Sequence, residues 1–205
     1  MLIVLTGPAS SGKDTILLKL ISKIPGLKRI VTTTTRSPRK GEEGGKDYNF
    51  VSKAKFSQMI KNGELLEYVD FSGAFYGTTK EAFKIVLEEE DTVWRIEMSR
   101  AGRLSEFFMS SFSPEEAERL LQNTKLIYID VPSWDILRER MRARGNSDGD
   151  IERRLTQDKS DFEQYGGIFK NIVMNEPGKL EETLDKIVNI KITETENKTK
   201  FLFFI

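Results

Sequence analysis

The sequence of 205 residues contains neither cysteine nor histidine. Without cysteine the chain forms no disulfide, carries no thiolate nucleophile and has no Cys-based zinc site. Without histidine it has no imidazole to serve as a general base or a metal ligand, which excludes most hydrolase and protease mechanisms. These absences leave chemistry that works by positioning and electrostatics, of which phosphoryl transfer is the main example.

An excess of charge of one sign is also lacking, because 32 basic and 32 acidic residues cancel. We therefore expect no nucleic-acid or membrane partner, and any affinity for phosphate must come from local clusters. No apolar run approaches the roughly 20 residues that span a bilayer, and the opening apolar run is too short for a signal peptide. We expect a cytoplasmic protein with one domain and a substantial core.

Apolar strand-like runs alternate with helical patterns along most of the chain. Strands are predicted at 2–6, 92–98, 125–131 and 171–175, and helices at 13–23, 53–62, 79–89, 101–123 (with a break before a Ser113 cap), 133–145 and 179–189. This alternation predicts an α/β fold with a central parallel sheet flanked by helices.

Two stretches interrupt the alternation, and such interruptions are where an α/β enzyme places its substrate lobe and lid. The first is rich in glycine and short β-prone pieces, with a hairpin turn predicted at Ser72-Gly73. The second is highly charged and is predicted to be helical in its second part. We therefore divide the chain into a core (1–30, 80–144 and 168–190), an inserted lobe (31–79), an arginine-rich lid (145–167) and a tail (191–205).

The stretch "GPASSGKDT", residues 7–15, follows the first predicted strand and opens the first predicted helix. It satisfies the pattern G-x-x-x-x-G-K. Glycines let several backbone N–H groups point inward, the helix N-terminus adds its positive dipole, and the lysine reaches the outer phosphates. The stretch predicts an ATP-binding loop made of Gly7, Pro8, Ala9, Ser10, Ser11, Gly12, Lys13, Asp14 and Thr15.

Asp14 breaks the consensus of this loop, because a serine or threonine normally follows the lysine and places its hydroxyl on Mg²⁺. A carboxylate is also a hard oxygen ligand for Mg²⁺, so metal binding need not be lost. Thr15 is the alternative source of a hydroxyl. Both residues are therefore candidate Mg²⁺ ligands, and the added negative charge predicts a tighter dependence on the metal.

A second constellation, in residues 32–52 and 63–79, suits a monophosphate acceptor. Arg36 and Arg39 form a pair of guanidiniums fit for bidentate capture of a phosphate. Tyr48 and Tyr76 have phenolic hydroxyls that can donate to the same phosphate. Glu42 and Glu67 have carboxylates that can accept from the adjacent N–H groups of guanine. Without the phosphate loop, the same residues would equally suit a polar surface lobe with ordinary salt bridges.

Three arginines in or just before the predicted lid fit the same chemistry. Arg140 and Arg144 lie at i and i+4 on one helix face, and Arg154 follows the segment "GNSDGD", which we expect to be a flexible link. Arginines on each side of a transferring group stabilise its equatorial oxygens without a base. The alternative is a solvated helix face on which Glu139 and Asp148 pair with these arginines.

These motifs resemble those of guanylate kinases from Leu2 to about Asn189. The quoted phosphate loop, "TTRSPRKGEEGGKDYNF" at 34–50, "EYVDFSGAFYGTT" at 67–79 and the arginine-rich lid carry the resemblance. It implies a single guanylate-kinase-like domain that transfers the γ-phosphoryl group of ATP to GMP, giving ADP and GDP, with Mg²⁺. Its partners would be small-molecule nucleotides, and the chain would act as a monomer or a homodimer.

The resemblance also implies roles for particular residues. The GMP phosphate would be held by Arg36, Arg39, Tyr48 and Tyr76, and guanine would be read by Thr32, Glu42, Glu67 and Thr78, with Glu97 keeping an acidic role in the same site. ATP would contact Arg140, Arg144 and, near the adenine, Asn175. The catalytic set would be Lys13, Arg36, Arg140 and Arg154.

The chain departs from the family at "WRIEMSRAG", residues 94–102, where an Asp-x-Asp strand followed by Gln-Gly is usual. Arg95 cannot take the acidic role that Glu97 can keep. "GKD" and "SRA" are similar to segments of ribose bisphosphate phosphokinases, which share the fold but lack the complete Arg, Glu and Tyr set. A kinase for dGMP or another nucleotide and a non-catalytic binding module remain alternatives, and the intact Gly12-Lys13 argues against the second. The apolar-ended tail has no family counterpart.

Overall fold

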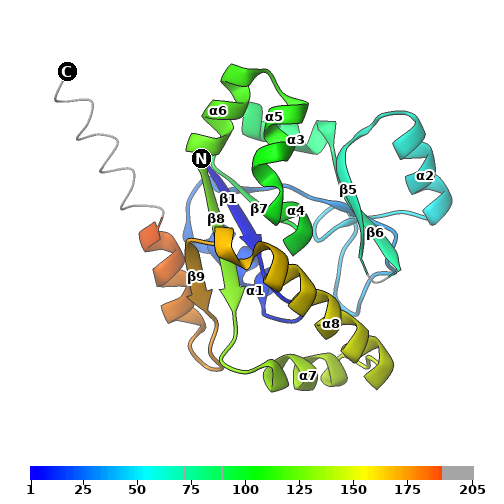
Figure 1. Cartoon of the computed structure of the whole chain (residues 1–205), viewed down its shortest axis with the longest axis vertical. Helices are drawn as coiled ribbons and strands as arrows, with labels where there is room; N and C mark the ends of the chain where they lie inside the picture. The colour runs from blue at the N-terminus through cyan, green and yellow to red at the C-terminus, as the bar shows by residue number, and fades with distance from the viewer. Residues whose placement is uncertain (72, 89, 191–205) are drawn as a thin grey trace.

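The computed structural model describes residues 1–71, 73–88 and 90–190, so Ser72 of the predicted turn and the predicted tail lie outside the described residues. Its central sheet contains five strands in the order β2 (Lys28–Arg29), β7 (Thr92–Arg95), β1 (Leu2–Thr6), β8 (Thr124–Asp130) and β9 (Asn171–Met174). All neighbouring pairs in this sheet are parallel. The predicted α/β class with a central parallel sheet is confirmed (Figure 1).

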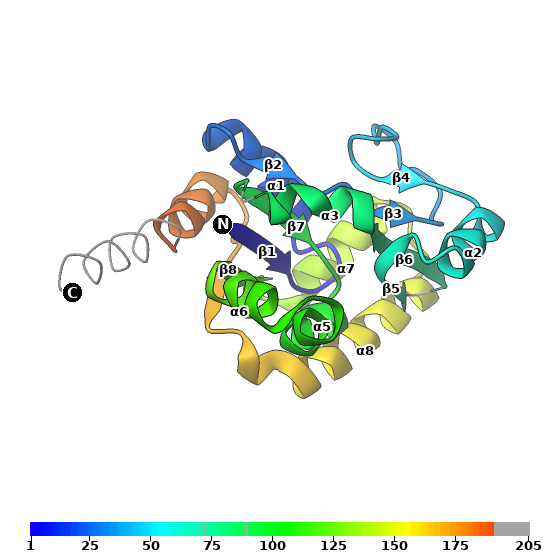
Figure 2. The ribbon, with the colours of Figure 1, turned by 90° about the horizontal axis from the view of Figure 1, so that it is seen from above.

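Helices cover both faces of the sheet, so β1 is apolar on both sides. Because successive strand residues point to opposite faces, Leu2 and Val4 join one core cluster while Ile3 and Leu5 join another. The first cluster also contains residues of α3 (Lys80–Leu87), α4 (Met98–Gly102), α5 (Leu104–Ser111) and α6 (Pro114–Gln122). The second contains α1 (Lys13–Lys23) and the helical residues 180–190. Figure 2 shows α1 and α5–α6 on opposite sides of the sheet.

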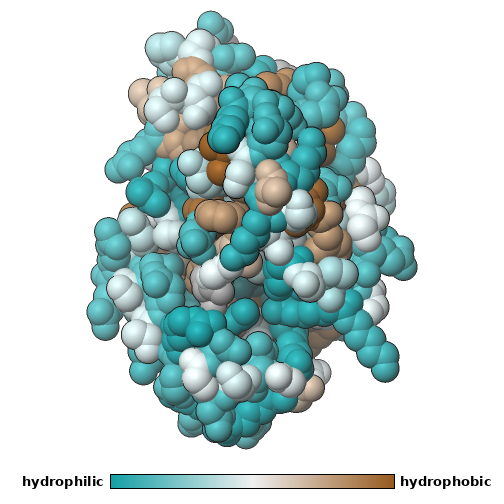
Figure 3. Space-filling model, turned by 90° about the vertical axis from the view of Figure 1, so that its right-hand side faces the viewer, coloured by the Kyte–Doolittle hydropathy of each residue, from teal (hydrophilic) through white to brown (hydrophobic). Residues whose placement is uncertain are grey.

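A second, smaller sheet stands beside the first. Its order is β4 (Asn49–Phe50), β3 (Thr33–Thr34), β6 (Ala74–Thr79) and β5 (Leu65–Phe71), and α2 (Lys53–Lys61) packs on it. Phe56 of α2 stacks on Phe75 of β6 with ring centroids 5.5 Å apart. The face that carries these elements is mainly hydrophilic, with apolar patches broken up by polar side chains (Figure 3).

The charged segment after β8 is more helical than expected. After α7 (Trp134–Ala143), α8 (Asp148–Tyr165) begins inside the stretch predicted as a flexible link, and the short helix η1 (Gly166–Ile168) follows α8. Ser147 caps α8 by accepting a hydrogen bond from the amide of Asp150 at 3.2 Å, and Asp148 favours the positive helix terminus. The prediction of a link through residue 150 is therefore wrong, because these polar residues start a helix.

Two other boundaries also differ from expectation. The strand predicted to reach residue 98 ends at Arg95, and the helix predicted over 101–123 is divided into α4, α5 and α6. The predicted cap is confirmed: Ser113 and Glu116 form a reciprocal capping box at the start of α6.

Parallel strands bring distant residues to one edge of the sheet. β1 runs into the phosphate loop, β7 ends at Arg95 and β9 is followed by Asn175. The β1–β7 register sets Leu5 opposite Arg95, so the end of β7 lies beside the start of the loop. Ligands of open α/β sheets bind at this carboxyl edge. Within the described part of the chain, no helix is both long and apolar enough to cross a membrane.

The packing of α1 under the sheet predicts the effect of truncating its inner face. Leu20 is fully buried, whereas Leu18 on the same helix is 41% exposed. We expect Leu20→Ala to lower the free energy of unfolding by about 2–5 kcal/mol, because a cavity replaces the side chain. The matched control Leu18→Ala should lower it by no more than about 0.5 kcal/mol. Urea unfolding measures both values, and equal losses would contradict this packing.

Candidate active site

The side chain of Lys13 lies over its own loop. Its Nζ donates to the carbonyl oxygens of Gly7 and Pro8, each at 2.7 Å, and the residue is only 3% exposed. Burial, followed by the positive charge of Arg95, lowers the pKa of Lys13 to about 8. An anion bound in the loop would raise the pKa of Lys13 again, because a nearby negative charge stabilises the protonated ammonium.

The loop approaches its neighbours too closely for side chains at two positions. Gly12 has a φ of 99°, and a Cβ there would lie 2.3 Å from Nδ2 of Asn175. That same Nδ2 donates to the carbonyl of Ser11 at 2.7 Å. At Gly7, with a φ of 139°, a Cβ would lie 2.3 Å from the Ile129 carbonyl oxygen. Glycine is therefore required at both positions, and Asn175 fixes the loop from the end of β9.

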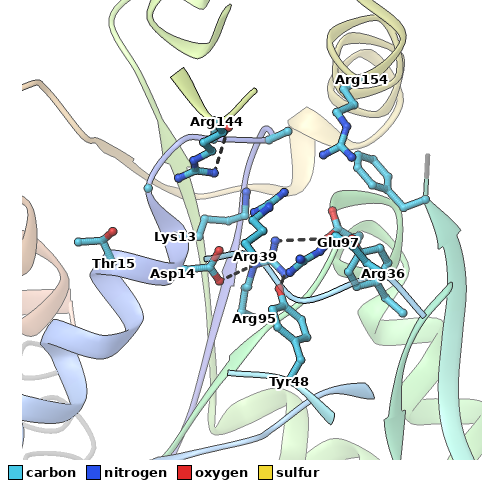
Figure 4. Close-up of a pocket in the computed structure, with 15 residues that line it drawn as sticks. Lys13, Asp14, Thr15, Arg36, Arg39, Tyr48, Arg95, Glu97, Arg144 and Arg154 are labelled. Carbon is cyan, nitrogen blue, oxygen red and sulfur yellow. Dashed lines mark hydrogen bonds and ion pairs between the residues drawn. The ribbon is translucent and has the colours of Figure 1, made fainter. Parts of the chain in front are cut away.

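Two arginines of the segment after β8 contact the phosphate loop at Ser10. Arg140 Nη1 donates to the carbonyl oxygen of Ser10 at 3.2 Å, and Arg144 Nη1 donates to the hydroxyl of Ser10, also at 3.2 Å. Ser10 itself adopts a φ of 65°. Arg154 reaches the same region from α8 (Figure 4). The structure thus brings Arg140 and Arg144 to the phosphate loop and Arg154 to the cavity beside it.

A carboxylate that sequence reasoning missed also meets the loop. Asp158 of α8 is 2% exposed and accepts a hydrogen bond from the amide of Ala9 at 2.7 Å. Burial raises the pKa of Asp158 to about 7, against the opposing effects of this hydrogen bond and of Lys13. Its only signal in the sequence is a helical position one turn beyond Arg154, which does not reveal the contact.

Six cationic side chains from distant parts of the chain line one cavity: Lys13, Arg36, Arg39, Arg95, Arg144 and Arg154. Most of the remaining wall is formed by Ala9, Ser10, Gly12, Asp14, Thr15, Tyr48, Tyr76 and Glu97. Lys13 and Arg39, predicted to lie in facing sites, therefore share one cavity (Figure 4).

Arg36 and Arg39 are organised by Glu42. Both terminal nitrogens of Arg36 donate to the Glu42 carboxylate at 2.9 Å, and the amide of Arg39 donates to it at 2.7 Å. Arg36 also lies over the ring of Tyr48, 5.3 Å from its centroid. Glu42 is not among the residues that line this cavity or the neighbouring one around Glu67, and its predicted contact with guanine stays a prediction.

A second cavity adjoins the first and is lined by Thr32, Glu67, Tyr76, Arg95, Glu97 and Arg100, among others. Glu67 accepts a hydrogen bond from the hydroxyl of Thr78 at 2.8 Å, and Arg100 Nε donates to it at 3.1 Å. Burial raises the pKa of Glu67, which these two contacts oppose. Thr78 in turn accepts from the indole N–H of Trp94 at 3.1 Å, so Glu67 is anchored to the apolar core.

The remaining predicted residues have clear places. Asp14 points into the first cavity toward Arg95, whereas Thr15 also lines a third cavity with Arg140, Arg144 and Asn175. Gly7, Pro8 and Ser11 shape the loop without lining the first cavity. Sequence reasoning recorded Arg95 and Arg100 only as departures from a pattern, yet both line the second cavity.

Comparison with known proteins agrees with this geometry. The model of the guanylate kinase family matches residues 1–193. The chain belongs to the guanylate kinase family. A guanylate kinase from Nostoc is 37% identical over 164 residues, 79% of this chain and 76% of the relative. One from Rhodococcus jostii is 32% identical over 198 residues, 95% of this chain and 88% of the relative.

A solved structure of a guanylate kinase is similar in fold to this chain. The guanylate kinase of Anaplasma phagocytophilum has a TM-score of 0.66 and 26% identity, covering 95% of this chain and 85% of that one. Because the chain belongs to this family, the protein is a kinase, that is, a phosphotransferase. The alternative of a non-catalytic binding module is therefore set aside.

The buried carboxyl of Asp158 predicts a pH-dependent contribution to stability. Its folded pKa of about 7 lies above the ordinary value of 3.8, so the folded state binds the extra proton. The stability it contributes is therefore fully present below pH 3.8 and is lost as pH rises through about 7. Asp158→Asn keeps an acceptor for the Ala9 amide and removes the titration.

We expect the stability of Asp158→Asn relative to the parent to increase by roughly 2 kcal/mol between pH 5 and pH 8. Urea unfolding of both proteins at the two pH values measures this change. A difference between the two proteins that stays constant from pH 5 to pH 8 would show that Asp158 does not titrate in this range.

Proposed function

We propose that the protein transfers the γ-phosphoryl group of ATP to GMP or dGMP, with Mg²⁺, giving ADP and the nucleoside diphosphate. The observation that supports this most directly is the shared cavity of Lys13, Arg36 and Arg39. A cation of the donor loop and a guanidinium pair of the acceptor lobe border one space. Phosphoryl transfer requires such a juxtaposition, because the reacting oxygens must come into line.

The donor nucleotide is assigned to the phosphate loop and the cavity beside it. The loop amides and the N-terminus of α1 suit the phosphates of ATP, and Lys13, Arg140 and Arg144 supply positive charge. The third cavity, which Thr15 and Asn175 line, lies where the loop meets the end of β9. It is the place that we assign to the adenosine.

The acceptor is assigned to the first two cavities. Arg36, Arg39, Tyr48 and Tyr76 would hold its phosphate; because burial raises the pKa of Tyr48, its hydroxyl remains a donor. Reading of the base is assigned to Thr32, Glu67, Thr78 and Glu97. In this arrangement Thr78 orients Glu67, and Glu42 orients the two arginines.

The residues present fit a Mg²⁺ ion that is shared with ATP. Within the described residues no group of three or more acidic side chains could hold a metal by itself, but Mg²⁺ is commonly held by one carboxylate together with substrate phosphates and water. Oδ1 of Asp14 is buried and makes no hydrogen bond, although Nε of Arg95 lies 3.2 Å away, and Thr15 adjoins Asp14 in the chain. Bound there, Mg²⁺ would neutralise charge on the phosphates.

The chain's own residues position and stabilise the reacting group. We assign catalytic roles to Lys13, Arg36, Arg140 and Arg154, which bring positive charge from the loop, the acceptor lobe and the segment after β8. Residues 31–79 would act as the acceptor lobe and 145–167 as a lid. Their closure would exclude water, which otherwise competes with the acceptor for the phosphoryl group.

Ribose bisphosphate is the second candidate acceptor, because Arg100 brings a positive charge into the cavity assigned to the base. In the structure this charge is paired with Glu67 at 3.1 Å. A paired arginine is less available to a second phosphate, so we place the nucleotide first.

A panel of acceptors tests the proposed function. ADP release is measured with ATP, Mg²⁺ and each nucleoside monophosphate, deoxynucleoside monophosphate or ribose bisphosphate in turn. We expect GMP or dGMP to give the highest kcat/KM, and Lys13→Met to abolish release with every acceptor. Faster turnover of ribose bisphosphate than of GMP and dGMP would refute the assignment of the base site.

The role of Asp14 is tested by a Mg²⁺ titration of Asp14→Ser beside the parent enzyme. If Asp14 is a ligand, its replacement should shift the half-saturating Mg²⁺ concentration by about tenfold, as expected from a loss of roughly 1.4 kcal/mol of binding energy. Activity at saturating Mg²⁺ should change less. Superimposable titration curves would exclude Asp14 as a metal ligand.

A further inference from the structure

Arg95 occupies the junction between the donor and acceptor sites. It is the last residue of β7, opposite Leu5 of β1, which is followed directly by Thr6 and the phosphate loop. Strand alternation sends its neighbours Trp94 and Ile96 into the core cluster on one face, so Arg95 points the other way, toward the start of α1. An arginine at this position therefore lies in the cavity and not in the core.

The contacts of Arg95 come from both halves of the site. Its Nε lies 3.2 Å from Oδ1 of Asp14 in the phosphate loop, and its Nη1 donates to the hydroxyl of Tyr48 in the acceptor lobe. Its Nη2 lies 3.5 Å from Oε1 of Glu97. Figure 4 shows the guanidinium between these groups.

The hydrogen-bonding capacity of Arg95 is not exhausted by these contacts. Its Nε is buried without a hydrogen bond, and so is the facing Oδ1 of Asp14, which means that the ion pair is close but poorly aligned. A guanidinium has five N–H donors in a fixed plane. Arg95 lines both the first and the second cavity, and the oxygens of a phosphoryl group are the acceptors that such donors favour.

The charge of Arg95 is also placed to act on the same anion as Lys13. Both side chains line the first cavity, so two positive charges face the same space and repel each other. An anion between them removes this repulsion. The group best placed to do so is the phosphoryl group in transit, since Lys13 belongs to the donor loop and Tyr48 to the acceptor lobe.

We propose that Arg95 is a further catalytic residue, whose guanidinium binds the phosphoryl group during its transfer and is held in position by Asp14 and Tyr48. This proposal rests on the phosphoryl transfer described above, although not on the identity of the acceptor. It gives Asp14 a second task, as the carboxylate that orients a catalytic cation from the donor side.

The step itself leaves Arg95 chemically unchanged. An oxygen of the acceptor phosphate forms a bond to the γ-phosphorus as the bond from that phosphorus to the bridging oxygen of ADP breaks, and the electron pair leaves with ADP. Negative charge on the three equatorial oxygens is stabilised by the N–H groups of Arg95. No proton or electron passes to the guanidinium.

Substitution of Arg95 separates this role from a merely structural one. With ATP, Mg²⁺ and the acceptor all saturating, we expect Arg95→Gln to lower kcat by about 10²–10³-fold, the usual cost of losing one transition-state donor. The KM for ATP should change by less than about threefold, because a transition-state contact affects kcat more than binding. Arg95→Lys should recover roughly tenfold of the loss, since it restores charge without the planar fork.

The matched control is Arg103→Gln, which also removes one arginine but from an exposed position, where Nε donates to the carbonyl of Ser99. It should retain kcat within about twofold, as surface substitutions away from special features usually do little. Thermal unfolding of all variants shows whether each is folded. A folded Arg95→Gln enzyme with a kcat within threefold of the parent would overturn the proposal.

A double variant distinguishes catalysis from charge balance. If Arg95 serves only to neutralise Asp14, removal of both charges in Asp14→Ser/Arg95→Gln should restore the kcat of Asp14→Ser at saturating Mg²⁺. If Arg95 binds the phosphoryl group, the double variant should stay about 10²-fold slower than Asp14→Ser. Equal kcat values for the two would overturn the proposal.

The acceptor used in these assays is the one that the parent enzyme phosphorylates fastest. An error in the GMP assignment would therefore appear as a different best acceptor in the parent enzyme. An error in the assignment of Arg95 would appear as an unchanged kcat in Arg95→Gln with that acceptor. The two failures remain distinguishable.

Discussion

Mutual repulsion among six cationic side chains around one cavity is the constraint on which the site depends. The pKa values of Lys13 and Arg39 are lowered, first by burial and then by neighbouring arginines. Against the effect of burial, Glu42 raises the pKa of Arg36 and Asp14 raises that of Arg95, so these two cations are the ones that carboxylates already compensate. Because the whole chain is electrically balanced, this positive field is local. It is only partly offset by nearby carboxylates such as Asp14, and a bound phosphate would relieve the rest. Affinity for polyphosphates follows from this imbalance.

The fold explains how such an unfavourable cluster is held together. Parallel strands direct the phosphate loop, Arg95 and Asn175 to one edge of the central sheet, and the smaller sheet brings Arg36 and Tyr48 to the same edge. The cations come from several segments, with Arg36 and Arg39 sharing the one between β3 and β4. Apolar clusters on both faces of the central sheet, and a third cluster between α7 and α8, hold most of these segments in place. The energy gained by burying the core thus offsets the repulsion at its edge.

The local part of this arrangement was accessible from sequence, and the pairing between distant parts was not. The first strand, the loop and α1 follow from consecutive residues, and their predicted ranges agree with the structure. The contact of Glu42 with Arg36, the contact of Asp158 with Ala9 and the meeting of Asp14 with Arg95 depend on strand register and helix docking. Asp14 and Arg95 looked like two unrelated departures, and only the β1–β7 register shows that they face each other.

The central claim is that a donor site and an acceptor site border one cavity at the carboxyl edge of the sheet. A ligand in which adenosine is joined to guanosine through a polyphosphate chain tests this claim most directly, by calorimetric titration and by competition with each nucleotide. The account predicts that one ligand binds per chain and displaces both ATP and GMP. Displacement of ATP alone, or binding of two ligands per chain, would contradict it.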